Sequence, residues 1–257
     1  MGEAYVVALL GHGEAGSRFL RDLAGTDARI SVFDPSPRTP VPIAYAAGSA
    51  AEAVGGADLV LSVNSGSVAL DVARTVAPHL RPAAIFADLN TTAPALKRAI
   101  CAVVGATQAT FVDVAVMGPV PREGIHTFCL ASGPAASRFV SIAESLGMNV
   151  EAISPEAGAA AERKLARSIF MKGLAASCIE ARAAARLLGC EEWLLGEITR
   201  ELEQANGALL DRLLQGSEQH ASRRVGEMRA VEQMERDIHI DPRIARAARE
   251  WLQELAL

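Results

Sequence analysis

Short apolar runs alternate with helical patterns along the first part of the chain, up to about position 150. The first run, residues 5–10, is apolar throughout and ends at a glycine-rich turn, which is typical of a fully buried strand. Further strands are expected at 29–34, 59–63, 84–88, 111–116 and 128–131. Residues 35–42 contain four prolines and are expected to form a loop. This alternation predicts a parallel sheet with helices on both faces.

After residue 150 the pattern becomes helical. We expect one long helix over 155–188, ended by Gly189, and further helices over 191–214, 217–236 and 242–255. The sequence therefore predicts an α/β Rossmann domain with a doubly wound parallel sheet over residues 1–153. An all-α domain over residues 154–257 follows it, and the long helix joins the two.

Composition and charge narrow the classes of function. Half of the 257 residues are hydrophobic and the net charge is −5, so a large core is expected and a nucleic-acid-binding surface is not. Basic residues occur at most in pairs, such as Lys97 and Arg98, which we interpret as part of a solvated face. No apolar run is as long as the roughly 18 residues that a membrane-spanning helix needs, so we expect no such helix.

Cysteine and histidine usage points to a protein without metal or disulfides. The four cysteines form no C-x-x-C pair, and the five histidines show no ligand spacing. The apolar N-terminal run has no basic segment before it, which argues against a signal peptide. We therefore expect a cytoplasmic protein with free thiols.

Residues 11–16 form the pattern G-x-G-x-x-G between the first predicted strand and a helix. In such a turn Gly11 permits the tight bend, Gly13 lets the backbone approach a pyrophosphate, and Gly16 lets helix and strand pack closely. The helix N-terminus offers free N–H groups to the phosphates. We assign cofactor binding to the consecutive residues Gly11, His12, Gly13, Glu14, Ala15 and Gly16.

Asp34 ends the second predicted strand, close to the spacing of about 20 residues at which an acidic residue is expected to accept a hydrogen bond from the adenosine ribose. A carboxylate there repels a 2′-phosphate, which favours NAD over NADP. Ser36 and Arg38 leave NADP open, because they are able to bind a phosphate if their loop folds back. Asn64 and Ser65 follow the third predicted strand and are expected to contact the cofactor as well.

Three further segments resemble motifs of the beta-hydroxyacid dehydrogenases, relatives of 6-phosphogluconate dehydrogenase. Residues 88–94 (D-L-N-T-T-A-P) are similar to D-x-S-T-x-x-P, and residues 113–119 (D-V-A-V-M-G-P) resemble D-A-P-V-S-G-G. Residues 158–164, with Ser168, resemble G-x-G-x-x-x-K-x-x-x-N. With the glycine-rich turn, these motifs span most of the range 1–175. Segments such as R-R-V-G-E-M at 223–228 resemble a less characterised branch of the family.

The resemblance implies roles for the matched residues and a homodimer formed through the helical domain. Asn90 and Thr91 would lie beside the nicotinamide, and Lys164 would be catalytic. Substrate binding would fall to the following residues: Met117, Gly118, Pro119, Ser168 and Lys172. Met117 and Pro119 replace a serine and a glycine of the family and offer neither hydroxyl nor N–H. We therefore expect the pocket to accept a bulkier or less polar group.

Lysine usage supports Lys164 independently of the resemblance. The chain contains 22 Arg but only three Lys, and two of these, Lys164 and Lys172, stand on the predicted joining helix. Arginine keeps its proton in proteins, so of these two residue types only lysine is suited to act as a general acid or base. Burial or a positive neighbour would lower its pKa towards neutrality.

These observations favour an NAD(P)-dependent dehydrogenase or reductase acting on a small hydroxy compound that resembles a β-hydroxyacid, or on its carbonyl partner. Two alternatives remain open. An imine reductase would act on C=N, but imine reductases that resemble this family usually lack the lysine. A dinucleotide-binding regulator without turnover would have no need for Lys164.

Overall fold

The computed structural model describes residues 4–257, which form two compact units that divide between Arg167 and Ser168. The division falls inside one long helix, beyond the boundary expected at 153/154. The division into a dinucleotide-binding domain and a helical domain at 153/154 stays a prediction.

The first unit is built on a seven-stranded sheet in the order β2-β1-β3-β4-β5-β6-β7. Its strands are β1 (Val6–Leu10), β2 (Arg29–Phe33), β3 (Leu59–Ser62), β4 (Ile85–Asp88), β5 (Thr110–Val116), β6 (Cys129–Ser132) and β7 (Val150–Ser154). Neighbouring strands run parallel, except that β6 is antiparallel to β5. The expected α/β Rossmann class is confirmed, while β7 is a strand that the sequence pattern missed and β6 departs from the purely parallel arrangement.

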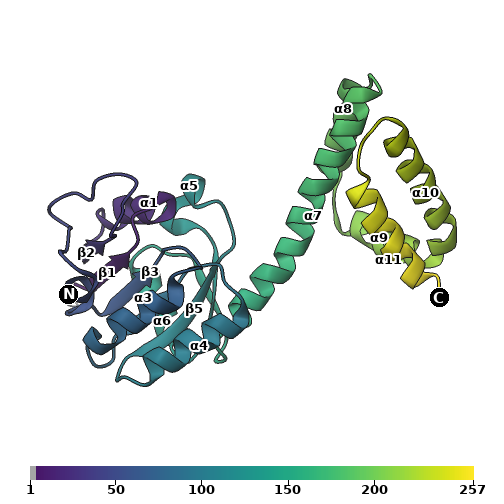
Figure 1. Ribbon diagram of the computed structural model, residues 1–257. Helices are drawn as coiled ribbons and strands as arrows, with labels where there is room; N and C mark the ends of the chain where they lie inside the picture. The colour runs from purple at the N-terminus through teal and green to yellow at the C-terminus, as the bar shows by residue number, and fades with distance from the viewer. Residues whose placement is uncertain (1–3) are drawn as a thin grey trace. The chain divides into compact units, whose positions relative to one another are not determined.

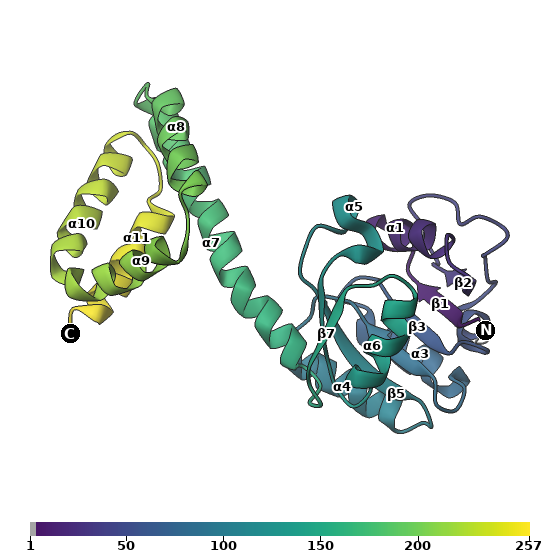
Figure 2. The ribbon, with the colours of Figure 1, turned by 180° about the vertical axis from the view of Figure 1, so that it is seen from behind.

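Helices cover both faces of this sheet. They are α1 (Glu14–Leu23), α2 (Ala50–Val54), α3 (Ala69–Val76), α4 (Pro94–Gly105), α5 (Val120–Glu123) and α6 (Ala136–Ser145), with short 3₁₀ turns at Ala77–His79 and Gly124–His126. Helices α3 and α4 lie in front of the sheet in Figure 1, and α6 lies in front of it in Figure 2.

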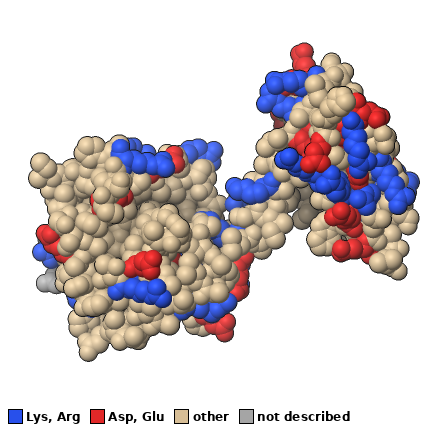
Figure 3. Space-filling model, viewed as in Figure 1, with Lys and Arg blue, Asp and Glu red and all other residues tan. Residues whose placement is uncertain are grey.

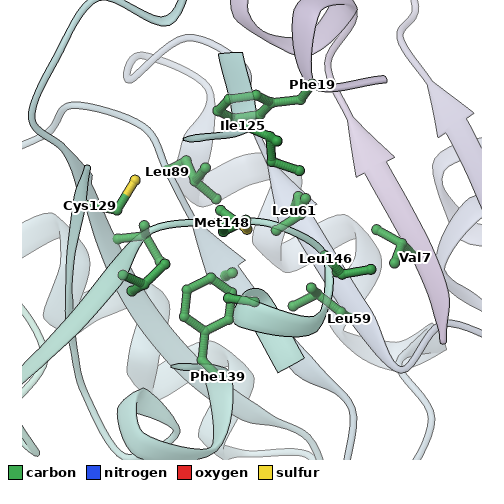
Figure 4. Close-up of a cluster of buried hydrophobic side chains, with 14 of the residues drawn as sticks. Val7, Phe19, Leu59, Leu61, Leu89, Ile125, Cys129, Phe139, Leu146 and Met148 are labelled. Carbon is green, nitrogen blue, oxygen red and sulfur yellow. The ribbon is translucent and has the colours of Figure 1, made fainter. Parts of the chain in front are cut away.

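The apolar core has two layers because successive strand residues point to opposite faces. In β1, Val7 and Leu9 pack into the layer beneath α1 and α6, while Ala8 and Leu10 pack into the layer beneath α2, α3 and α4. Phe19 of α1 and Phe139 of α6 close the first layer over β3 (Figure 4). The same alternation continues through β3 and β4, whose last residues are polar.

The second unit is all helical. It contains most of α7 (Ala159–Leu187), then α8 (Glu191–Glu203), α9 (Gly207–Gln219), α10 (Ala221–Asp237) and α11 (Arg243–Leu255). Gly189, with φ +75°, follows the end of α7 as expected. Helix α7 begins at Ala159 rather than at Pro155, because Gly158 still has φ +98° and cannot be part of the helix.

The sequence predicts two helices, over 191–214 and 217–236, and the structure has three in this range, α8, α9 and α10. The Asn206 side chain accepts a hydrogen bond from the Leu209 N–H at 3.2 Å, and this cap starts a separate helix, α9. Glu180 of α7 accepts from the N–H groups of Ile244 and Ala245, at 2.8 and 3.0 Å, and so holds the start of α11.

Charged side chains lie close together over this unit in Figure 3. No helix within residues 4–257 is long and apolar enough to cross a membrane.

Candidate functional site

A cavity of about 860 Å³ opens at the carboxyl ends of β1 to β5 in the first unit. Ligands bind at this edge of open α/β sheets, where strand order reverses around the first strand. The cavity brings together these predicted site residues: Gly11, Gly13, Glu14, Ala15, Asp34, Asn64, Ser65, Asn90, Thr91, Gly118 and Lys164. Segments that are far apart in the sequence therefore meet in one place.

The three glycines of the turn occupy three different environments. Gly11 has φ +109°, and a Cβ there would lie 2.4 Å from the Val63 carbonyl oxygen. A Cβ on Gly16 would lie 2.0 Å from the Gly11 carbonyl oxygen, whereas a Cβ on Gly13 would meet nothing within 4 Å. Gly11 and Gly16 are thus required by the protein's own backbone. Gly13 leaves open space at the N-terminus of α1, where a diphosphate fits.

Asp34 and His12 hold the proline-rich loop against this turn. The Asp34 carboxylate accepts from the His12 N–H at 2.6 Å and from the Ser36 N–H at 2.8 Å. The buried His12 ring places Nδ1 3.1 Å from the Thr39 carbonyl oxygen, and His12 itself does not face the cavity. Asp34 and Arg38 both line the cavity, so the pair expected to discriminate between cofactors faces the same space.

A row of buried polar side chains crosses the α4 side of the sheet, next to Asn90 of the cavity lining. Ser62, Asp88, Asp113 and Ser132 are register partners across β3, β4, β5 and β6, and none of them has measurable exposure. Two positions earlier in each of β3, β4 and β5, the same face of the sheet carries an apolar residue. Buried polar atoms have to be hydrogen-bonded, so the groups that satisfy this row identify the segments that depend on it.

Lys97 of α4 is the cation of this row. Its Nζ lies 2.8 Å from Asp88 Oδ2, 3.0 Å from Asp113 Oδ1 and 2.8 Å from the Asp88 carbonyl oxygen, and its side chain is 1% exposed. The interpretation of Lys97 as part of a solvated basic pair is therefore wrong. The sequence did carry a signal, because Lys97, Ile100 and Val104 are the buried residues of α4 and share one helical stripe.

Asn90 connects the row to the cavity. Its Nδ2 donates to Ser62 Oγ at 3.2 Å, to Asn64 Oδ1 at 2.9 Å and to Asp88 Oδ1. Asn90 Oδ1 is buried and has no hydrogen-bond partner among residues 4–257. That oxygen is an acceptor available to a ligand with an amide or hydroxyl group, and a carboxamide such as that of nicotinamide fits it.

Lys164 lies on α7, one turn beyond the point where this helix meets the sheet. The N–H groups of Ala160 and Ala161 donate to Ser132 Oγ and Asp113 Oδ2, both at 2.9 Å. Burial lowers the pKa of Lys164 from its ordinary value, and the neighbouring charge of Lys97 lowers that pKa further. Lys164 is thus half-buried beside a cation, at the mouth of the same cavity that the glycine turn lines.

The expected substrate loop is only partly turned towards the cavity. Gly118 lines it together with Val116 and Val120. Met117 packs against Ala115, Leu130 and Ala160, and Pro119 precedes the first residue of α5. Their contact with substrate stays a prediction, and the lining that flanks Gly118 is apolar.

Two predicted substrate residues belong to the second unit. Ser168 is half-buried and Lys172 is exposed, both on α7. Their roles stay predictions as well. All four cysteines are free, and burial raises the pKa of the Cys129 thiol to about 12, which makes it an inert core residue.

Comparison with known families assigns both parts of the chain. Residues 6–150 match the family described as the NAD binding domain of 6-phosphogluconate dehydrogenase, and residues 185–255 match a domain of unknown function, DUF1932. The first match covers more than half of the chain. The chain belongs to this family of NAD(P)-binding proteins.

Individual relatives agree with this assignment. An uncharacterised 28.5 kDa protein from the 7S RNA 5′ region of Methanothermus fervidus is 31% identical over 179 residues, 68% of this chain and 66%, just under two thirds, of that protein. The conserved protein MTH1747, described as structurally similar to 3-hydroxyacid dehydrogenases, is 27% identical with a TM-score of 0.64, covering 97% and 96% of the two chains. An imine reductase variant from Myxococcus stipitatus in complex with NAD+ is 20% identical with a TM-score of 0.81, covering 99% and 94%, and shows the shared fold.

The glycine environments predict opposite outcomes for two alanine substitutions. Gly13→Ala should leave the melting temperature within about 2 °C of the wild type, because the new methyl group meets no atom. It should weaken binding of NADH or NADPH about tenfold or more by blocking the approach of the pyrophosphate. Gly16→Ala, the matched control, should instead cost roughly 1–3 kcal/mol of stability. Calorimetric titration and thermal unfolding check both, and unchanged cofactor affinity in Gly13→Ala would contradict the assignment of this turn.

Proposed function

We propose that this member of the 6-phosphogluconate dehydrogenase-like family is an oxidoreductase that moves a hydride between NAD(P) and a small hydroxy compound, with Lys164 as general acid and base. The observation that carries the proposal is the position of Lys164, a half-buried lysine with a lowered pKa, in the cavity that the glycine turn also lines. Perturbed pKa values in a cleft mark functional groups.

Oxidation of an alcohol requires two transfers, a hydride from carbon and a proton from oxygen. The bound nicotinamide ring would accept the hydride from carbon. Neutral Lys164 Nζ would take the proton from the hydroxyl oxygen as the C=O bond forms, and protonated Lys164 would return it in the reverse direction. A lysine pKa close to the working pH serves both directions, and burial together with the charge of Lys97 moves the Lys164 pKa in that direction.

The other cavity residues would bind and orient. Asn90 offers an unpaired acceptor oxygen, and its amide nitrogen is fixed by three acceptors, so its orientation is set before any ligand arrives. Leu89, Val116 and Val120 give part of the cavity an apolar wall. This apolar wall supports a substrate with an apolar group beside its hydroxyl carbon.

The first test compares Lys164→Met with the wild type in a turnover screen of hydroxy compounds. We expect kcat to fall by about 10²–10⁴-fold, since the proton acceptor is lost, while cofactor affinity stays within about twofold. In the oxidation direction wild-type activity should rise with pH through a midpoint below 10.5, the ordinary lysine pKa, because the neutral amine is the active form.

Arg163→Met is the matched control for this test. It removes a cation from the preceding position of α7, where the Arg163 side chain is exposed and donates to the Ala159 carbonyl oxygen. Its turnover should equal that of the wild type. Equal turnover in Lys164→Met would refute the assigned role.

We also propose NAD as the preferred cofactor. Both carboxylate oxygens of Asp34 accept backbone N–H groups, so the carboxylate is held in place beside the cavity, where its negative charge would repel a 2′-phosphate. Arg38 lines the same cavity and is the feature that would favour NADP.

Titration with the two cofactors tests this preference. Wild type should bind NADH about tenfold more tightly than NADPH, and Asp34→Asn, which keeps one acceptor oxygen, should bring the two affinities together. Arg38→Gln should leave NADH affinity unchanged. Tighter binding of NADPH by the wild type would give the decisive role to Arg38.

We further propose a homodimer formed through the helical unit. Ile169, Phe170, Ile179, Trp193 and Trp251 are all more than 60% exposed in this unit, which is more large apolar surface than a small helical domain leaves to water.

Sedimentation equilibrium tests the dimer. The wild type should sediment at twice the 27.0 kDa of one chain, and Phe170→Asp should shift the equilibrium towards one copy by placing a charge in the interface. Ile43→Asp, at an exposed apolar position of the first unit, should not change the mass. A wild type that sediments as a single chain at micromolar concentration would contradict the proposal.

A further inference from the structure

We propose that Lys97 is a positioning residue for the reaction: its ammonium group bridges Asp88 and Asp113 and thereby fixes the Asn90 loop and the first turn of α7, with Lys164, relative to each other. This inference rests on the function proposed above, because it concerns the residues that would carry it. Lys97 itself lies outside the matched motifs, but both of its partners begin one: Asp88 begins residues 88–94 and Asp113 begins residues 113–119.

Each of the two aspartates divides its oxygens between Lys97 and one functional segment. Asp88 gives Oδ2 to Lys97 and Oδ1 to Asn90, whose N–H lies 3.4 Å away and whose amide nitrogen also donates to it. Asp113 gives Oδ1 to Lys97, and its Oδ2 accepts from the Ala161 N–H at 2.9 Å and from Ser132 Oγ, itself bonded to the Ala160 N–H, at 3.3 Å. Among residues 4–257, Lys97 is therefore the one group that both carboxylates share.

The second of these contacts sets the position of Lys164. A carboxylate at a helix N-terminus satisfies free N–H groups and interacts favourably with the helix dipole. Ala160 and Ala161 precede Lys164 by four and three positions, so the three side chains share one face of α7. That face is the one held against the sheet by Ser132 and Asp113.

Charge is the second contribution of Lys97. The charged groups that face Lys164 are Lys97 on α4, Asp113 on β5 and Arg167 on α7, and the titratable but neutral Cys129 thiol on β6 faces it as well. Lys97 and Arg167 favour the neutral amine of Lys164, while Asp113 favours its ammonium form. Without Lys97, two buried carboxylates would lack a counter-ion, and the ammonium of Lys164 would be stabilised in its place.

Stability alone does not account for a buried ion triad. Two aspartates and a lysine removed from water lose solvation that their mutual attraction repays only in part, and apolar replacements of buried charges are often as stable. Here the oxygens that Lys97 leaves free serve Asn90 and α7 rather than the core. The triad thus connects the Asn90 loop with the first turn of α7, and the proposed reaction requires these two segments to keep a fixed relative position.

The test uses the small number of lysines in this chain. Competitive acetylation across a pH series, read by mass spectrometry, reports the pKa of Lys164 without any substrate, and exposed Lys172 is an internal reference. In Lys97→Met we expect the Lys164 pKa to rise, because the neighbouring positive charge that lowers it is removed. The pH midpoint of turnover should rise with it, and kcat should fall by up to about 100-fold.

Arg98→Met is the matched control. It removes a positive charge from the next position of α4, where Arg98 is more than half exposed and pairs with Glu162 at 3.4 Å. Solvent screens such a pair, so the Lys164 pKa and the pH profile should stay as in the wild type.

A second variant covers the case in which Lys97→Met fails to fold. Lys97→Met combined with Asp88→Asn removes one buried carboxylate charge together with the ammonium, and the Lys164 pKa should again rise because Asp113 remains. An unchanged Lys164 pKa in a folded variant would overturn the proposal. Failure of both variants to fold would also overturn it, because Lys97 would then be needed for the fold itself.

The two variants, Lys164→Met and Lys97→Met, distinguish an error in the proposed function from an error in this inference. If Lys164→Met turns over as well as the wild type, the proposed role of Lys164 is wrong whatever the labelling shows. If Lys164→Met is inactive but Lys97→Met keeps both the wild-type labelling curve and its pH profile, only the role of Lys97 is wrong.

Discussion

The buried contact of Lys97 with Asp88 and Asp113 is the interaction on which the organisation of the site depends. On the α4 side of the central sheet, Ser62, Asp88 and Asp113 form one row where the earlier positions of their strands are apolar. Removing one partner from a buried ion pair costs about 3–5 kcal/mol, so the segments bonded to this row are tied to its geometry. The Asn90 loop and the first turn of α7 are those segments.

The glycine turn was predictable because its requirements are local. Positive φ at Gly11 and the close approach at Gly16 follow from a strand that reverses into a helix within one short turn, whatever surrounds them. Asp34 was predictable for the same reason, since its place at the end of the second strand follows from its spacing along the chain from the glycine turn. The strand–helix alternation predicted the positions of β1 to β6, because most of these strands are buried and apolar on both faces, but it did not predict that β6 runs antiparallel to β5.

The missed features depend on tertiary contacts. Strand β7 is only partly buried and includes Glu151, so its sequence lacks the apolar run that marked the other strands. The break between α8 and α9 rests on one Asn206 cap within a helical pattern. Lys97 was assigned to solvent because a lysine is rarely buried. Only the two aspartates, which strand register places side by side beneath α4, make its burial possible.

The same geometry explains why two lysines persist in a chain that otherwise uses arginine. The Nζ of Lys97 meets three oxygens within 3.0 Å, a cluster suited to a compact ammonium with rotatable donors and not to a planar guanidinium. Lys164 has a different need, since in the proposed reaction it exchanges a proton. Because Asp113 contacts Lys97 through one oxygen and the helix of Lys164 through the other, one carboxylate positions both lysines.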